Sequence, residues 1–527
     1  MRLKASAALT ATLLSLGLPS FAHAGRNQES IFQDDNHLIY ASSATVSHVL
    51  DVLASLGVDR LRVTILWKAI APNALSRTRP HFNAADPAAY PTGTWMPYDR
   101  VLELAAQRGI TVDFNVTAPG PLWAMRHDAP TARSADHFAP SVADFQRFVQ
   151  AVGTRYSGTY VPNAQGAGSS PVPRVSYWTI WNEPNIPGWL APQSRAVDGR
   201  QVENSPRLYR EYVDAAWTAL KASGHTVARD TILIGELAPE GYPPLGWYTG
   251  MTPMRFLRAL YCVDSSYRQL GGQRASALGC PTRGGGAAFV KSHPGLFGAT
   301  GFAHHPYYFF YPPAYSAPNP DFVPLSDLGR LERGLDRIYG NYGVHRRIPI
   351  YLTEYGYQTN PPDPYQLVSP AQQAVYLNQA DFMAWRDPRV RAVGQFLLYD
   401  DRPDARYTPS EFGYWDTFQT GLLYMDGSRK PAFNTYRMPI WLPSSRVRSG
   451  ARLSIWGQIR PAPDNTSQSV RIEWRPSGGA FRRIATVTVP SSSAEGYFTA
   501  AVRVPGSGAV RIAWQSLTSR SASFSVG

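Results

Sequence analysis

Short apolar runs alternate with longer amphipathic segments between about residue 30 and residue 438. The runs are rich in Val, Ile, Leu and aromatic residues and show no regular polar alternation, which is typical of strands buried on both faces of a parallel sheet. We therefore expect strands at Ser30–Gln33, Leu61–Trp67, Ile110–Val116, Val175–Trp181, Thr231–Glu236, Gly301–His304, Pro349–Glu354 and Ala392–Tyr399.

The segments between these runs carry helix signals. Val46, Val49 and Leu53 repeat at helical spacing before Gly57, a residue type that commonly ends helices. Ser369-Pro370 supplies a capping hydroxyl and a first-turn proline before another helical stretch. Repeated strand-then-helix order with eight strands predicts an α/β fold of the closed (β/α)8 type, a TIM barrel. An open doubly wound sheet is the alternative, but the first strand-to-helix turn lacks the glycine pattern of a dinucleotide site.

The pattern changes after Pro439. Helical periodicity disappears, and short alternating runs are separated by turns rich in Ser, Gly and Pro. This pattern predicts a small antiparallel β-sandwich of immunoglobulin-like or fibronectin-like type at 440–527, which follows the barrel at 25–439. A packing or spacer role is expected for the C-terminal domain, with carbohydrate binding as the alternative.

The first residues predict export. Arg2 and Lys4 precede an apolar stretch from Ala5 to Leu18, and Ala22-His23-Ala24 offers small residues for cleavage. This is the pattern of a signal peptide over 1–24, so the mature protein is expected to be secreted or periplasmic. A membrane anchor is the alternative reading. No later segment is both long and apolar enough to span a bilayer, so we expect no membrane span.

Charge and cysteine content indicate which partners, cross-links and metal sites to expect. The formal net charge is +13, but the basic residues are scattered along the chain. We therefore interpret the charge as a solvated surface and expect no nucleic-acid partner. The two cysteines, Cys262 and Cys280, are expected to form a disulfide in an exported chain, with free buried thiols as the alternative. No group of His or Cys has ligand spacing, so neither a metal nor a cofactor is expected.

Two glutamates carry the candidate chemistry. Glu183 follows the fourth expected strand in Trp-Asn-Glu-Pro-Asn, and Glu354 ends the seventh in Leu-Thr-Glu-Tyr-Gly. Active sites of (β/α)8 barrels lie at the carboxyl ends of the strands, so both carboxyl groups should face one depression. Such a pair can cleave a glycosidic bond, with one group donating the proton and the other attacking the sugar. Arg62 and Tyr307 are the candidate donors that keep Glu354 ionised.

Five motifs in this chain order resemble the clan A retaining glycoside hydrolases, nearest to family 39 and the related family 5. They are Leu-Arg-Val-Thr-Ile-Leu-Trp, Ala-Pro-Gly-Pro-Leu-Trp-Ala, Trp-Asn-Glu-Pro-Asn, His-His-Pro-Tyr and Leu-Thr-Glu-Tyr-Gly. The resemblance covers roughly residues 30–438. It implies cleavage of a β-linked glycan by double displacement, with Glu183 as acid/base and Glu354 as nucleophile.

The resemblance also implies substrate-binding residues. Asn182 is expected to contact the sugar 2-hydroxyl, Arg62 and Tyr307 to orient the nucleophile, and Trp123 to line the donor-sugar site. His304 and His305 are adjacent, so they point to opposite faces of a strand. We expect one to line the cleft, with His304 as the candidate, and the other to pack behind it.

Several questions remain open at this stage. Many clan members end the eighth strand with a tryptophan, whereas this chain has Gln395-Phe396-Leu397 there. Glu236 follows the fifth strand and is interpreted as structural or substrate-contacting. A transglycosylase using the same residues and a non-catalytic glycan-binding barrel are the alternative functions. The expected partner is an oligo- or polysaccharide, and the protein is expected to be monomeric.

Overall fold

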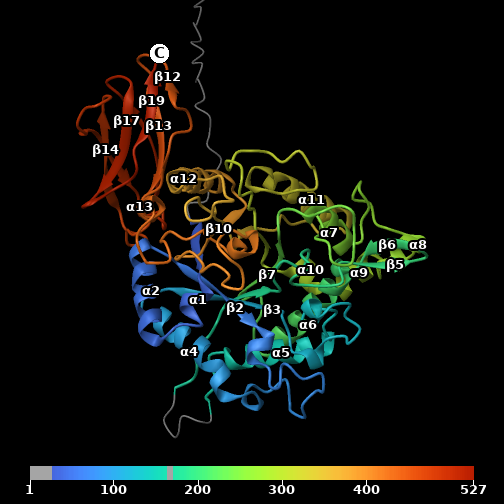
Figure 1. The fold of residues 1–527 in the computed structure, drawn as a ribbon. Coiled ribbons are helices and arrows are strands. Elements are labelled where there is room, and N and C mark those ends of the chain that lie inside the picture. Colours follow the sequence, from blue (N-terminus) through green and yellow to red (C-terminus); the bar gives the residue numbers. More distant parts are fainter. Residues whose placement is uncertain (1–26, 163–169) are drawn as a thin grey trace, which may run out of the picture.

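A computed structural model describes residues 27–162 and 170–527. The expected signal peptide, 1–24, lies outside the described residues. The chain forms a barrel followed by two β-sheets (Figure 1).

Eight parallel strands close the barrel in the order β1-β10-β9-β8-β7-β4-β3-β2. They are β1 (Glu29–Gln33), β2 (Arg60–Leu66), β3 (Thr111–Thr117), β4 (Tyr177–Ile180), β7 (Thr231–Leu237), β8 (Gly301–His304), β9 (Ile350–Leu352) and β10 (Val390–Phe396). Each lies within or overlaps one of the runs expected to form strands. The prediction of a (β/α)8 barrel is therefore confirmed.

The interior of the barrel is more polar than the expected pattern implied. In β2 and β3, apolar residues such as Leu61, Val63 and Phe114 alternate with polar ones such as Arg62 and Asp113, and all five are buried. The polar members bond to other strands inside the barrel: Thr179 donates to Asp113, and Arg62 donates to Glu354. The strands are buried on both faces, as expected, but in β2 and β3 the second buried face is the polar barrel interior and not an apolar layer.

Helices surround the barrel. The α-helices up to β7 are α1 (Asp35–Leu38), α2 (Ser43–Leu56), α3 (Trp67–Ile70), α4 (Thr92–Ala106), α5 (Val142–Arg155) and α6 (Ser205–Ala222). The later ones are α7 (Pro253–Leu260), α8 (Gly272–Ala277), α9 (Gly286–Ser292), α10 (Pro294–Gly298), α11 (Leu328–Asn341), α12 (Pro370–Arg386) and α13 (Pro431–Arg437). Short 3-10 helices are η1 (Pro87–Ala89), η2 (Leu122–Ala124), η3 (Ala132–Ser134), η5 (Leu325–Asp327) and η6 (Phe412–Trp415).

Local sequence explains the ends of the best-marked helices. The Ser42 side chain accepts a hydrogen bond from the Thr45 amide at the start of α2, and Gly57 ends that helix with φ +74°. Ser369 and Gln372 form a reciprocal capping box at the start of α12. None of the helices in the described part of the chain is long and apolar enough to cross a membrane.

Two insertions enlarge the loops after the strands. The hairpin of β5 (Ser194–Val197) and β6 (Arg200–Glu203) follows β4. Helices α7 to α10 lie between β7 and β8, and a disulfide joins Cys262 to Cys280 within this segment. The Cα atoms of the two cysteines are 5.7 Å apart, a distance that suits a disulfide.

The C-terminal strands form two sheets over one core. One sheet contains β11 (Ile440–Trp441), β13 (Arg452–Gln458) and β16 (Tyr497–Arg503), and the other β12 (Arg446–Val447), β14 (Gln468–Arg475), β15 (Arg482–Val489), β17 (Gly508–Trp514), β18 (Leu517–Thr518) and β19 (Ala522–Val526). Most neighbours are antiparallel, while β12 and β19 pair in parallel. Leu453 and Val502 of the first sheet share a hydrophobic cluster with Ile472 and Ile512 of the second.

The C-terminal sheets pack against the barrel next to α12 (Figure 1). Phe382 and Trp385 of α12 form an aromatic cluster with Trp456 and Tyr497 from the first C-terminal sheet. Polar contacts surround this cluster, including the ion pair of Arg460 with Asp381 at 3.3 Å.

Candidate active site

A cavity of about 530 Å³ opens at the carboxyl ends of the barrel strands. This is the end at which (β/α)8 enzymes place their active sites, and the volume suits a small-molecule site. Its lining is mixed, with carboxyl, amide and aromatic side chains. The lining residues are Gln33, Asp35, Asn36, Tyr40, Thr64, Leu66, Asn182, Glu183, Ile186, Trp189, Ala238, Pro239, Glu240, Tyr242, Tyr307, Phe309, Glu354, Phe396, Leu397, Asp401 and Phe418.

The two motif glutamates meet in this cavity. Glu183 follows β4 and Glu354 follows β9, and carboxylate oxygens of the two lie within 4.8 Å of each other and of a ring nitrogen of His305. Their side chains are 18% and 10% exposed, so both are accessible from the cavity. The backbone at Glu183 has φ +37°, and at Trp181 +70°. Left-handed backbone at residues other than glycine is strained and concentrates at functional sites.

Arg62 holds the nucleophile candidate from inside the barrel. This guanidinium is completely buried and donates to Glu354 Oε1 at 2.6 Å and to Asn182 Oδ1 at 2.6 Å. It also donates to Gln33 and Glu236. Because Asn182 Oδ1 accepts from Arg62, the side-chain NH2 of Asn182 is the group that remains for a ligand in the cavity.

Tyr307 completes the contacts of Glu354. Its hydroxyl donates to Glu354 Oε2 at 3.2 Å, and its ring stacks on Phe309 at a centroid distance of 4.9 Å. Both rings line the cavity. The structure thus brings together Glu183, Glu354, Asn182, Arg62 and Tyr307, which had been singled out from the sequence.

The structure places His305, and not His304, at the site. His305 Nδ1 lies 2.9 Å from Glu183 Oε1 and 3.4 Å from Glu354 Oε2, and Nε2 lies 2.7 Å from Glu236 Oε2. His304 points away and bonds through Nε2 to the Val323 carbonyl at 2.7 Å, so the choice of His304 was wrong. Side chains alternate along a strand, so His305 shares the inward face with Ala303.

Glu236 is a third carboxylate of the cluster, buried beneath the other two. It accepts hydrogen bonds from Arg62 and from the Thr353 hydroxyl, the latter at 2.7 Å, and is 0% exposed. A register shift between Gly235 and Leu237 makes Glu236 an extra residue in β7, and its φ is +50°. Such a bulge re-aims a side chain, here into the barrel. Gly235 suits this bulge because its φ is +108° and a Cβ there would lie 2.6 Å from the Ala303 carbonyl oxygen.

The charges of the cluster favour a protonated His305 ring and an ionised Glu236 carboxylate. Burial lowers the pKa of His305, but the carboxylates of Glu354 and Glu236 outweigh burial and raise this pKa to about 10. Burial raises the pKa of Glu236, yet Arg62 and His305 more than compensate and leave it below its ordinary value. Burial raises the pKa of Glu354 above its ordinary value, with His305 and Arg62 acting in the opposite direction.

Glu183, His305 and Glu354 are also close enough together to surround a cation. However, both ring nitrogens of His305 face carboxylates, and its pKa of about 10 keeps the ring protonated at neutral pH. An imidazolium has no lone pair for a metal. The donor set therefore suits proton transfer better than metal binding.

Trp123 does not line the cavity, contrary to the sequence-based prediction. It lies in η2, is 6% exposed, and its ring nitrogen donates to the Pro72 carbonyl at 2.9 Å. Its ring packs edge-on against Trp67 and Phe82, so it belongs to the packing of the loops. At the end of β10, where many clan members have tryptophan, Phe396 lines the cavity together with Phe418.

Acidic side chains near the cavity divide between lining and support. Asp401 lines the cavity, whereas Asp400 is buried and forms an ion pair with Lys430 at 2.6 Å.

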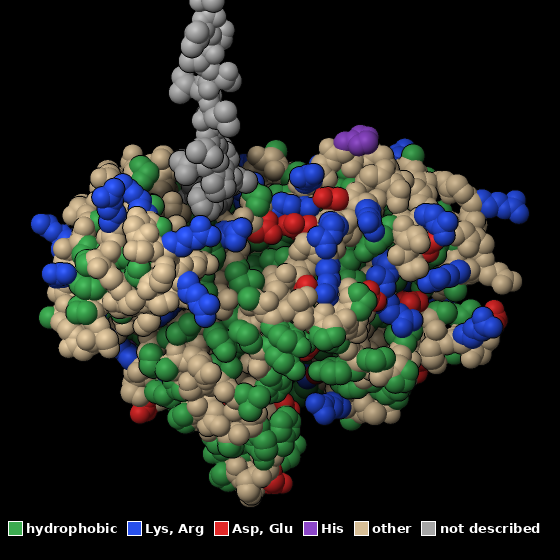
Figure 2. Space-filling model, turned by 90° about the horizontal axis from the view of Figure 1, so that it is seen from above, with side chains coloured by type: hydrophobic (Ala, Val, Ile, Leu, Met, Phe, Trp, Pro, Cys, Tyr) green, Lys and Arg blue, Asp and Glu red, His purple; other side chains and the backbone are tan. Residues whose placement is uncertain are grey.

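Over the face of the molecule seen in Figure 2, Lys and Arg side chains are spread among acidic and hydrophobic ones and do not form a single dense block.

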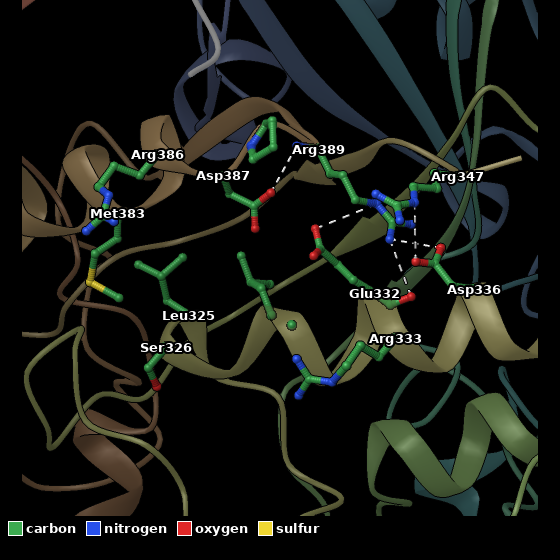
Figure 3. Close-up of a pocket in the computed structure, with 13 residues that line it drawn as sticks. Leu325, Ser326, Glu332, Arg333, Asp336, Arg347, Met383, Arg386, Asp387 and Arg389 are labelled. Carbon is green, nitrogen blue, oxygen red and sulfur yellow. Dashed lines mark hydrogen bonds and ion pairs between the residues drawn. The ribbon is translucent and has the colours of Figure 1, made fainter. Parts of the chain in front are cut away.

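A second cavity, of about 580 Å³, lies outside the barrel between α11 and the end of α12 (Figure 3). Arg389 at its wall lies 3.0 Å from Asp336 and 3.7 Å from Glu332. Arg389 thus pairs with two carboxylates of this groove, and none of the cluster around Glu183 lines it.

No protein-family model matches the sequence, and no curated protein matches it. Solved structures do match. A glucosidase from Croceicoccus marinus is 13% identical, with 91% of this chain and 94% of that chain covered and a TM-score of 0.45. The endo-beta-1,4-mannanase from Thermotoga petrophila is 12% identical, with 95% and 98% covered and a TM-score of 0.41. The family 1 b-glucosidase from Thermotoga maritima is 14% identical, with 74% and 84% covered and a TM-score of 0.42. At this level of similarity, function has to be inferred from the side chains of the site.

Proposed function

We propose that the chain is a secreted retaining glycoside hydrolase that cleaves a β-linked glycan, with Glu183 as acid/base and Glu354 as nucleophile. The observation that carries this proposal is the separation of their carboxylate oxygens, within 4.8 Å. Retaining enzymes hold the two carboxyl groups about 5–5.5 Å apart, whereas inverting enzymes hold them about 6.5–9.5 Å apart to admit a water molecule. The short separation favours direct attack on the sugar.

The charges of the cluster supply the proton that the first step needs. Arg62 and protonated His305 face three glutamates, so three ionised carboxylates would leave one excess negative charge inside the barrel. One proton on the set removes this excess. Glu183 is the member that can pass a proton to the leaving oxygen, because its side chain is the most exposed to the cavity and only its Oε1 faces His305.

The reaction then proceeds in two displacements. In the first, a Glu354 oxygen bonds to the anomeric carbon, the bond from this carbon to the leaving oxygen breaks, and Glu183 gives its proton to that oxygen. In the second, Glu183 takes a proton from water, the water oxygen bonds to the anomeric carbon, and Glu354 leaves as a carboxylate. Arg62 and Tyr307 stabilise the carboxylate of Glu354 before attack and after release.

Paired alanine variants test both roles. Glu354→Ala should lower kcat at least about 1000-fold, and azide should restore turnover as a glycosyl azide of inverted configuration. Glu183→Ala should react only with activated aryl glycosides, and azide should give the azide of retained configuration. Normal activity of Glu354→Ala, or the same anomer from both variants, would refute the assignment. Added acceptor sugars separate hydrolysis from transglycosylation.

Secretion belongs to the same proposal. Its support is the charged start, apolar stretch and Ala22-His23-Ala24 of the first residues. Sequencing the N-terminus of the exported protein should show a mature chain that begins after Ala24.

A further inference from the structure

Three tyrosines form a stacked group in the loop that follows β8. The ring centroids of Tyr308 and Tyr311 are 4.8 Å apart, and those of Tyr311 and Tyr315 are 4.2 Å apart with an angle of 13° between the planes. We call these three residues the tyrosine shelf. Tyr311 is 39% exposed and Tyr315 is 37% exposed, so aromatic surface faces the solvent.

The backbone holds the shelf in place. The Tyr311 amide donates to the Tyr308 carbonyl at 3.1 Å, and the Tyr315 amide donates to the Pro312 carbonyl at 2.9 Å. The Tyr357 hydroxyl donates to the Tyr311 carbonyl at 2.9 Å, which ties the loop to the segment after β9. Rings held in this way lose little conformational entropy when a ligand binds.

The shelf continues from the cavity. Tyr308 lies between Tyr307 and Phe309 in the chain, and these two stacked rings line the cavity. Glu240 also lines the cavity, and its charge acts on the Tyr308 hydroxyl, whose pKa is raised by burial first and by Glu240 second. One stacked pair of rings thus lines the cavity, and the tyrosine shelf is a separate stack that starts from the same stretch of the chain and reaches the solvent.

We propose that the tyrosine shelf binds sugar units beyond the cavity, so that the substrate is a glycan chain longer than the cavity holds. This inference rests on the proposed glycosidase function. The flat C–H faces of pyranose rings stack on aromatic rings, and the tyrosine shelf presents grouped aromatic surface beside the cavity. A substrate consisting of one terminal sugar on a small leaving group would fill the cavity and leave the shelf unused.

A double variant, Tyr311→Ala/Tyr315→Ala, tests the shelf. The probes are β-1,4-mannan, β-1,4-glucan and β-1,3-glucan oligosaccharides from disaccharides to octasaccharides, together with aryl glycosides. For the longest oligosaccharides that the wild type cleaves, kcat/KM should fall about tenfold or more, because two stacking rings are lost. For aryl glycosides it should stay within about twofold. The matched control, Tyr311→Phe/Tyr315→Phe, keeps the rings and should behave like the wild type.

Affinity measurements separate this inference from the proposed function. In a Glu354→Ala background, binding of the same oligosaccharides should tighten with chain length, and the double alanine variant should lose that gain. Failure of the catalytic assignment shows as activity that survives Glu354→Ala, whereas failure of the shelf shows as affinity that does not rise with length. Equal losses on long and short substrates in the double alanine variant would also overturn the inference.

Discussion

His305 contacts carboxylates through both of its ring nitrogens, and this arrangement organises the whole cluster. Nδ1 faces Glu183 and Glu354, which are accessible from the cavity, while Nε2 faces the fully buried Glu236. Glu236 also accepts from Arg62, so one buried carboxylate holds both cations that face the reacting pair. Glu236 is therefore a positioning residue, which acts through Arg62 and His305 and does not line the cavity.

Glu236→Gln should lower kcat about 10–100-fold with little change in fold. The amide has the shape of the carboxylate but removes the charge that faces Arg62 and His305 at Oε2, and its NH2 group would face the Thr353 hydroxyl, which now donates to Oε1. The pH profile of kcat/KM should shift as well, because His305 loses one of the charges that raise its pKa. Thr353→Val is the control: it removes a neutral hydrogen bond to Glu236 and should have a smaller effect. An unchanged pH profile for Glu236→Gln would contradict this role.

The stability of the folded protein should fall as the pH rises from about 6.5 to 10. His305 has a folded-state pKa of about 10, above the ordinary value of 6.5, so the folded state binds the proton more tightly than the unfolded chain. Its contribution is complete below pH 6.5 and is lost as the pH approaches 10, with a magnitude on the order of a few kcal/mol. Denaturant unfolding at several pH values measures this loss as a fall in the free energy of unfolding. A His305→Asn variant should show a flatter pH dependence, and equal slopes for both proteins would refute the assignment.

Some site residues could be predicted individually and others could not. Glu183, Glu354 and Asn182 follow strands in recognisable motifs, which brings them to the carboxyl ends of the barrel strands, and Arg62 reaches Glu354 from inside the barrel. Alternation showed that His304 and His305 point to opposite faces, but which of them faces inward became clear only from the packing of Ala303 inside the barrel. Trp123 was not decidable: an aromatic residue after a strand can face either the cavity or the loops, and contacts distant in sequence determine which.

At the scale of elements, the barrel strands were predictable because each is a short apolar run followed by a helix signal. The bulge in β7 was not, because it depends on pairing with β8 and on the close approach of Gly235 to Ala303. This one extra residue turns Glu236 from the outer face to the barrel interior. The inward direction of the Glu236 side chain thus depends on how β7 pairs with β8, and the pattern of apolar residues does not determine that pairing.

Loss of the disulfide should destabilise the α7–α10 insertion without damaging the site. The bond from Cys262 to Cys280 spans 18 positions, and closing such a loop contributes about 3 kcal/mol in the chain-entropy estimate. Neither cysteine lines the cavity. The double variant Cys262→Ser/Cys280→Ser should therefore melt at a lower temperature and keep the kcat of the wild type at temperatures where it is folded. A large loss of kcat with an unchanged melting temperature would contradict this separation.

At the scale of the whole molecule, the barrel and the C-terminal sheets share buried surface. Trp456 is 0% exposed and packs against Phe382 and Trp385 of α12, with ring centroids 5.7 Å and 5.9 Å away. The ion pair of Arg460 with Asp381 lies on the same side of α12. The C-terminal sheets cover an apolar face of the barrel, which supports a packing role for them.

Trp456→Ala should therefore lower the free energy of unfolding by about 3–5 kcal/mol, because it leaves a large cavity between the two parts. A chain that ends at Pro439 should aggregate, since Phe382 and Trp385 would be exposed on α12. Phe481→Ala is the matched control for Trp456→Ala. The Phe481 ring lies beneath Arg475 and Arg511 of the C-terminal sheets and outside the aromatic cluster on α12, so its loss should lower the free energy of unfolding only slightly. Because the aromatic cluster does not line the cavity, folded Trp456→Ala should keep the kcat of the wild type. A soluble and fully active truncated barrel would instead mean that the C-terminal sheets are dispensable for stability, which would contradict the packing role.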